Sequence, residues 1–129
     1  MDEAAVAAWL ERYVAAWRSY DPVAIGDLFT EDAVYRWHPY DEGEEVVRGR
    51  DDIVASWIGD PDDPSSWEAS YRPWAVDSDR AVAVGVSTYF KPDRTVDRVY
   101  HNVFLLRFAA DGRCAEFTEL FMREPDRPG

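Results

Sequence analysis

The second half of the chain carries four long strand patterns in a row, and this feature restricts the fold more than any other. β-branched and aromatic residues recur there at strand spacing over residues 67–76, 80–90, 96–108 and 113–123. Short turn signals separate the patterns, at Asp77-Ser78-Asp79, Lys91-Pro92-Asp93 and Asp111-Gly112. Connections this short join neighbouring antiparallel strands, so the pattern predicts an antiparallel meander of four strands.

The first half of the chain predicts helices. Apolar residues recur at three- and four-residue steps from Asp2 to Tyr20, which is the spacing of one face of an amphipathic helix. Asp2 is placed to cap this helix. Asp21-Pro22 ends it and begins a second, short helix, with Asp21 as the cap and Pro22 at the first position. The two helices are expected to form a hairpin.

A strand and a third helix complete the predicted order. The strand covers residues 33–38 and is stopped by Pro39. The third helix follows Asp51-Asp52 and is ended by Gly59-Asp60-Pro61. The order of helix, helix, strand, helix and meander predicts one α+β domain over residues 1–129, in which helices pack on one face of a curved sheet.

The charge of the chain argues against two classes of partner. With 26 acidic residues against 14 basic ones the formal charge is −12, so neither nucleic acid nor an anionic membrane surface is an expected partner. Aromatic residues make up 15% of the chain, so a packed interior is expected despite the charge. The acidic runs DEGEE and DPDDP lack the EF-hand order of ligands and are expected to be solvated surface.

No motif in the sequence indicates a metal or a cofactor, and none is expected. Cys114 is the single cysteine, which excludes an intrachain disulfide and predicts a small buried thiol. His38 and His101 are too isolated to specify a metal site. An acidic N-terminus, and an apolar stretch broken by Glu11 and Arg12, predict a cytoplasmic protein without a signal or membrane span. Thirteen Arg against one Lys fit a GC-rich bacterial genome.

Two stretches of the chain resemble a known family. The first is WLERYVAAWRSYDPVAIGDLFTEDAVYRWHP followed by VVRGRDDIVASW, and the second is VYHNVFLLRFAADGRCAEFTELFM. Both resemble the nuclear transport factor 2-like superfamily, especially its SnoaL-like branch, which includes polyketide cyclases and ketosteroid isomerases. The resemblance implies a cone-shaped curved antiparallel sheet wrapped around the N-terminal helices, with a pocket inside the cone.

The resemblance also implies a homodimer through the outer face of the sheet. Strand alternation gives that face a set of apolar residues with one histidine, namely His101, Val103, Leu105, Leu120 and Met122. A protein–protein module that uses this face is the least supported of three functional classes.

The two better supported classes are a small-molecule enzyme and a binding protein. Pockets of this family serve isomerases, cyclases, dehydratases, epoxide hydrolases and noncatalytic binding proteins, so function must be argued from the site. The first class is a cofactor-independent isomerase, cyclase or dehydratase that acts on an apolar, ring-containing substrate. The alternative is a noncatalytic protein that binds a small apolar or aromatic molecule.

Resemblance to ketosteroid isomerases supplies two catalytic candidates. Those enzymes stabilise an enolate with a tyrosine and a protonated aspartate while a second aspartate moves the proton. Tyr13 corresponds to the tyrosine, but the base position holds Trp37 or His38, depending on the alignment, and the other acid falls at Phe104. Authentic ketosteroid isomerisation is therefore not expected. His38 is either a general base or a hydrogen-bonded or exposed histidine at a strand end.

Glu119 is the third catalytic candidate. Strand alternation places it on one face between Phe117 and Phe121. Inside a cone, desolvation would raise the pKa of Glu119 and make it a usable acid or base. The alternative is a partly wet glutamate paired with an arginine at the sheet rim.

Nine further residues are expected to bind the ligand. For Trp57 the alternative is core packing, which applies to Tyr13 as well, and for Asn102 it is a hydrogen bond to the backbone of a neighbouring strand. The nine are Trp17, Tyr35, Trp37, Trp57, Tyr100, Asn102, Phe104, Phe117 and Phe121.

Overall fold

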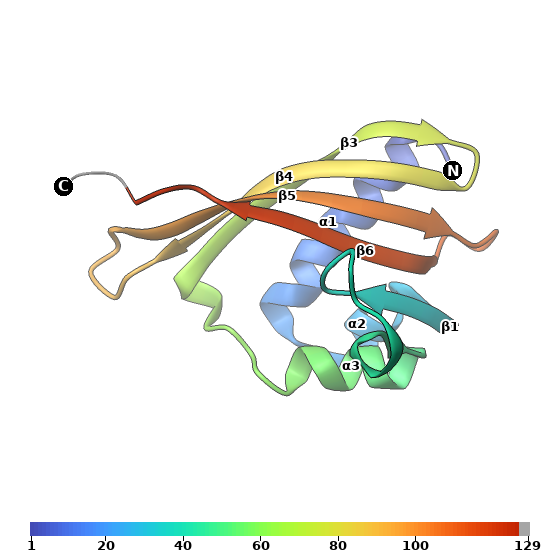
Figure 1. Ribbon diagram of the computed structural model, residues 1–129, viewed down its shortest axis with the longest axis horizontal. Coiled ribbons are helices and arrows are strands. Elements are labelled where there is room, and N and C mark those ends of the chain that lie inside the picture. The colour runs from blue at the N-terminus through green and yellow to red at the C-terminus, as the bar shows by residue number, and fades with distance from the viewer. Residues whose placement is uncertain (127–129) are drawn as a thin grey trace.

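The computed structural model describes residues 1–126 and contains, in this part of the chain, a six-stranded curved sheet and three α-helices (Figure 1). The helices are α1 (Glu3–Ser19), α2 (Pro22–Gly26) and α3 (Arg50–Ile58), and two 3-10 turns lie at Gly43–Glu45 and Pro64–Ser66. The strands are β1 (Phe29–Arg36), β2 (Val47–Arg48), β3 (Trp67–Asp77), β4 (Arg80–Phe90), β5 (Val96–Phe108) and β6 (Cys114–Arg123). The predicted α+β class is confirmed.

The strands β3 to β6 form the predicted antiparallel meander, and the sheet order is β2-β1-β6-β5-β4-β3. One pair departs from the antiparallel arrangement, because β1 runs parallel to β6, with Tyr35 opposite Phe117. β2 pairs with β1 over two residues and has no sequence pattern of its own. The sheet is therefore mixed, and β1 joins it beside the last strand of the meander.

The first strand is displaced from its predicted range of 33–38. It begins at Phe29, where the backbone pairs with Cys114 of β6, and it ends at Arg36. After it the chain turns, and the backbone N–H of His38 donates to the carboxylate of Asp41 at 3.1 Å. Trp37 and His38 consequently lie outside the strand, and strand alternation does not set the direction of their side chains.

Local chemistry fixes the limits of α1. The side chain of Asp2 accepts a hydrogen bond from the backbone N–H of Ala5 at 2.8 Å, which caps the first turn. At the other end Tyr20 has a left-handed backbone (φ 51°), and its N–H donates to the carbonyl of Ala16. α1 packs along β3. No helix within residues 1–126 is long and apolar enough to cross a membrane.

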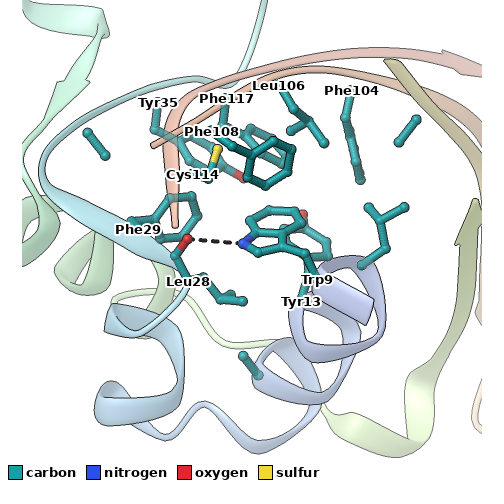
Figure 2. Packing of buried hydrophobic residues seen from close by; sticks show 14 of the residues in the cluster. Trp9, Tyr13, Leu28, Phe29, Tyr35, Phe104, Leu106, Phe108, Cys114 and Phe117 are labelled. Atoms are coloured by element: carbon teal, nitrogen blue, oxygen red, sulfur yellow. Dashed lines mark hydrogen bonds between the residues drawn. The ribbon is translucent and has the colours of Figure 1, made fainter. Parts of the chain in front are cut away.

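Aromatic rings around Trp9 fill one end of the space between α1 and the sheet (Figure 2). The indole N–H of Trp9 donates to the carbonyl of Leu28 at 3.0 Å, and the rings of Phe29, Phe108 and Phe117 surround the indole. Cys114 lies buried in the same cluster, and burial raises the pKa of its thiol. This end of the fold is a dry core.

Candidate functional site

A cavity of about 450 Å³ lies between the helices and the inner face of the meander. This volume falls within the range of roughly 300–1,000 Å³ typical of small-molecule pockets. From the helices, the turn after β1 and the loop after α3 the lining residues are Tyr13, Trp17, Tyr20, Trp37, Ser56, Trp57, Asp60 and Asp62. From the strands they are Tyr71, Ser87, Tyr89, Arg98, Tyr100, Asn102, Glu119 and Phe121. The walls are mainly aromatic.

Strand alternation brings the polar groups of the cavity to its sheet side. Glu119 on β6 lies opposite Phe104 on β5, and Asn102 lies two residues along β5 from Phe104. Gly85 on β4 lies opposite Tyr71 on β3. A methyl group at Gly85 would overlap the ring of Tyr71, so glycine at this position lets that ring lie close over the sheet.

Glu119 is a carboxyl group held among aromatic rings. Its side chain makes no hydrogen bond or ion pair with any residue of the described chain. Burial alone raises the pKa of Glu119 from 4.5 to about 7. Near neutral pH the carboxyl therefore populates both its ionised and its protonated form, which suits it to both accept and donate a proton.

Tyr13 lines the same cavity and lies within the electrostatic influence of this carboxyl. Its ring stacks on Trp9 and on Phe117, with both centroids at 5.6 Å, and meets Trp57 edge-on at 5.3 Å. Burial, followed by the neighbouring Tyr35 and the negative charge of Glu119, raises the pKa of Tyr13 well above 10. The hydroxyl therefore stays protonated and can donate a hydrogen bond into the cavity.

Asn102 and Ser87 form a polar pair in the cavity wall. The side-chain amide of Asn102 donates to the hydroxyl of Ser87 on β4 at 3.0 Å, and both residues are buried. The partner of Asn102 is thus a side chain of the neighbouring strand and not, as the alternative expected, its backbone, and Asn102 also lines the cavity. Ligand binding by Asn102 stays a prediction.

The residues predicted to be catalytic or to bind the ligand lie in three places: the cavity lining, the hydrophobic core and the rim of the cavity. Those lining the cavity are Tyr13, Trp17, Trp37, Trp57, Tyr100, Asn102, Glu119 and Phe121. Tyr35, Phe104 and Phe117 do not line it, because the ring of Tyr13 packs against Phe104 and Phe117, and Tyr35 stacks on Phe117 at 4.4 Å. These three residues form the floor beneath the cavity and belong to the core.

His38 lies on the rim and does not line the cavity. Its Nδ1 lies 3.1 Å from a carboxylate oxygen of the buried Asp41, and its ring packs on Tyr40 and Phe121. The strand ends two residues earlier, at Arg36, so the turn and Asp41 determine where the imidazole lies. Of the two readings, a hydrogen-bonded histidine at a strand end describes this placement.

Several lining residues were not expected from the sequence. Tyr71, Ser87 and Tyr89 come from β3 and β4, where a strand-parity argument could have found them. Asp60 and Asp62 come from the loop after α3, including the DPDDP run that was expected to be solvated surface. Asp62 is half-buried and accepts a hydrogen bond from the indole N–H of Trp17 at 3.3 Å. No local pattern signals that this loop folds back to the cavity.

Metal coordination has no candidate in the described part of the chain. Among residues 1–126 no group of three or more His, Cys, Asp and Glu side chains gathers in a way that could hold a metal ion.

Solved structures with this architecture come from several bacteria. An NTF-2 like protein of unknown function from Burkholderia xenovorans LB400 is 19% identical, with a TM-score of 0.70 over 98% of this chain and 90% of that one. A ketosteroid isomerase-like protein from Erwinia carotovora atroseptica SCRI1043 is 19% identical, with a TM-score of 0.61 over 95% and 97%. An NTF2-like protein with a cystatin-like fold from Novosphingobium aromaticivorans is 22% identical, with a TM-score of 0.62 over 92% and 80%. At these identities the likeness shows the fold.

Sequence comparison reaches the same family. No curated protein matches the chain. The family model of the SnoaL-like domain, however, matches residues 10–117, which is well over half of the chain and includes the second half of α1, all of α3 and the first part of β6. The chain therefore belongs to the SnoaL-like family, within the NTF2-like fold.

Proposed function

We propose that this protein takes a small, largely apolar, ring-containing molecule into the cavity and moves a proton on it without a cofactor. The observation that carries the proposal is Glu119, a carboxyl group with a pKa of about 7 among aromatic walls. General acid–base catalysis is most effective when the pKa of the catalytic group lies near the working pH. Burial in the cavity supplies this pKa without any charged partner.

The proposed step is abstraction of a proton from a carbon next to a carbonyl group. The carboxylate of Glu119 takes the proton, and the electron pair of the broken C–H bond forms an enolate whose negative charge lies on the carbonyl oxygen. The protonated hydroxyl of Tyr13 donates a hydrogen bond to that oxygen. Glu119 then returns the proton to another carbon, which completes an isomerisation, or to a departing hydroxyl, which completes a dehydration.

The reaction differs from authentic ketosteroid isomerisation in its donors. Phe104 occupies the position of the second acid and lies in the core, so the proposal assigns the enolate oxygen one hydroxyl donor, Tyr13, although the hydroxyls of Tyr71 and Ser87 also line the cavity. A single neutral donor stabilises an enolate less than a pair of donors does. The proposal therefore favours substrates whose α-proton is already acidic, such as β-dicarbonyl or conjugated cyclic ketones.

Hydrogen–deuterium exchange into a panel of cyclic ketones tests the proposal. Mass spectrometry should show catalysed exchange with the wild-type protein. Glu119→Gln should lower the rate by about 10²- to 10⁴-fold, and Tyr13→Phe by about 10²- to 10³-fold. The matched control is Glu116→Gln on the same strand, because Glu116 faces outward and pairs with Arg107 at 3.4 Å. A rate that Glu119→Gln leaves unchanged would overturn the catalytic proposal.

A noncatalytic binding protein is the second candidate. The observation that favours it is the isolation of Glu119, whose carboxyl makes no hydrogen bond with the described residues that would fix its direction. Thermal stabilisation by the ketone panel without catalysed exchange would favour this candidate.

We also propose that the protein forms a homodimer through the outer face of the sheet. Leu105 and Met122 are 44% and 75% exposed on that face, beside Val103 and Leu120. Apolar patches of this kind mark interaction surfaces. Light scattering at micromolar concentration should give the mass of a dimer, and Met122→Glu should shift it toward the monomer. A wild-type protein that is strictly monomeric would contradict the proposal.

A further inference from the structure

We infer that the open end of the cavity holds an organic cation, so the ring-containing ligand carries an amine or quaternary ammonium group. The inference rests on the proposed function, because it assigns a charge to the ligand of the same cavity. Asp60 and Asp62 are the proposed partners of the positive charge.

The charges that line the cavity are predominantly negative. Asp60, Asp62 and Glu119 contribute three carboxyl groups, and none of them makes an ion pair with any residue of the described chain. Arg98 is the basic residue of the lining, and its guanidinium pairs with Asp97 at 2.7 Å. A bound cation would therefore meet unpaired carboxylates, whereas a bound carboxylate would be repelled by them.

Aromatic rings at the same end add a second attraction. Trp17, Tyr20 and Tyr89 line the cavity beside Asp62, and the faces of such rings attract cations. The guanidinium of Arg98 lies 4.1 Å from the centroid of the Tyr89 ring and covers one of its faces, and Trp17 stacks one face on Trp67 at 3.6 Å. A ligand cation would therefore meet the second face of each ring.

The field of Asp62 extends over these rings. Burial, and after it the negative charge of Asp62, raises the pKa of Tyr89. The tyrosine rings therefore stay neutral while the carboxylate makes their end of the cavity attractive to positive charge. At longer range the net charge of −12 favours the approach of cations to the protein.

The two ends of the cavity can thus bind different parts of one ligand. Asp60 is exposed and Asp62 half-buried at the open end, where a charged group keeps part of its hydration. Tyr13, Trp57 and Asn102 are buried at the inner end, where an apolar ring system loses its hydration shell. A cationic head at the open end leaves the ring beside Glu119.

A set of three adamantane ligands tests this inference, because they share one cage and differ in charge. Binding of 1-adamantylammonium, 1-adamantanol and adamantane-1-carboxylate is measured by calorimetry at pH 7.5. The ammonium should bind at least about fivefold more tightly than the alcohol, and the carboxylate should bind most weakly. Asp62→Asn and Asp60→Asn should each lower ammonium affinity severalfold and leave alcohol affinity unchanged.

Glu11→Gln is the matched control, since Glu11 is exposed on α1, outside the lining, and the change alters the net charge by the same amount. It should leave all three affinities unchanged. Alcohol or carboxylate binding as tight as ammonium binding, or a preference that both Asp→Asn variants retain, would overturn the inference while leaving the proposed small-molecule function standing. Failure of all three ligands to bind would count against the proposed function as well.

Discussion

The inner face of the sheet has two ends that share the same strands and differ in almost everything else. On β6, Phe117 is fully buried, whereas Phe121, four residues later on the same face, is 49% exposed. On β5, Phe104 is buried in the core, whereas Tyr100 is half-buried and lines the cavity. One end is a dry aromatic core and the other an open cavity.

The length of α1 explains the difference. Trp9 and Tyr13 of α1 fill the space over Phe104 and Phe117, but α1 ends at Ser19 and the long strands continue past it (Figure 1). Toward the end of the helix, side chains from α1, α3 and the loop after α3 line the space without filling it. Because the sheet extends beyond the helix that covers it, room is left for a ligand. Glu119 lies at the boundary between the core and the cavity.

Truncation of a phenylalanine at each end of β6 is the strongest test of this comparison. Phe117→Ala should lower the free energy of unfolding by about 3–5 kcal/mol, because it opens a hole in a close-packed core. Phe121→Ala should cost less than about 1 kcal/mol, since its ring is half exposed. Chemical denaturation measures both. Equal losses in the two variants would show that the two ends do not differ in packing.

Replacement of Glu119 tests the boundary between the two ends. The raised pKa means that the folded protein binds a proton that the unfolded chain has lost between pH 4.5 and about 7. Stability from this group is therefore highest below pH 4.5 and falls as the pH rises to about 7. Glu119→Gln should raise the free energy of unfolding at pH 8 by roughly 1–3 kcal/mol and leave it near the wild-type value at pH 4.

Denaturant titrations of both proteins across pH 4–8 measure this difference, with Glu116→Gln as the exposed control. A gain in stability at pH 8 together with a loss of proton exchange is the combination expected of a group kept for function. A Glu119→Gln protein that is less stable than wild type at pH 8 would contradict the placement of the carboxyl in a desolvated site.

Removal of one hydroxyl from the cavity wall should have the smallest effect. Ser87→Ala takes away the acceptor for the side-chain amide of Asn102, a buried hydrogen bond of 3.0 Å. The expected loss in the free energy of unfolding is about 1 kcal/mol. Thermal unfolding measures this loss, with Ser70→Ala as the comparison, because Ser70 on β3 is exposed. An unchanged free energy of unfolding would indicate that water in the cavity accepts the hydrogen bond of the Asn102 amide equally well.

Much of the fold could be predicted because it rests on short-range patterns. The four meander strands agree with their predicted ranges to within one residue, since turn residues such as Asp111-Gly112 mark where each strand must stop. The first strand was misplaced, because its limits depend on parallel pairing with β6, which is distant in the sequence. The turn at His38 depends in the same way on the carboxylate of Asp41.

The cavity could be predicted only in part, for a similar reason. Alternation along β5 and β6 identified Tyr100, Asn102 and Glu119 as residues of one face. It could not say where along that face the helix stops covering the sheet, so Phe104 and Phe117 were grouped with the lining although they lie in the core. The sequence did not predict Asp60 and Asp62 in the lining, because the amino-acid composition of a loop does not determine which way the loop folds.

Burial of Glu119 in the cavity should make its carboxyl titrate near neutral pH. Carbon-13 NMR of the side-chain carboxyl groups, with Glu119 assigned by comparison with Glu119→Gln, measures this directly. We expect a titration midpoint close to pH 7 for Glu119 in the ligand-free protein. A midpoint close to 4.5, the value of an exposed glutamate, would contradict it.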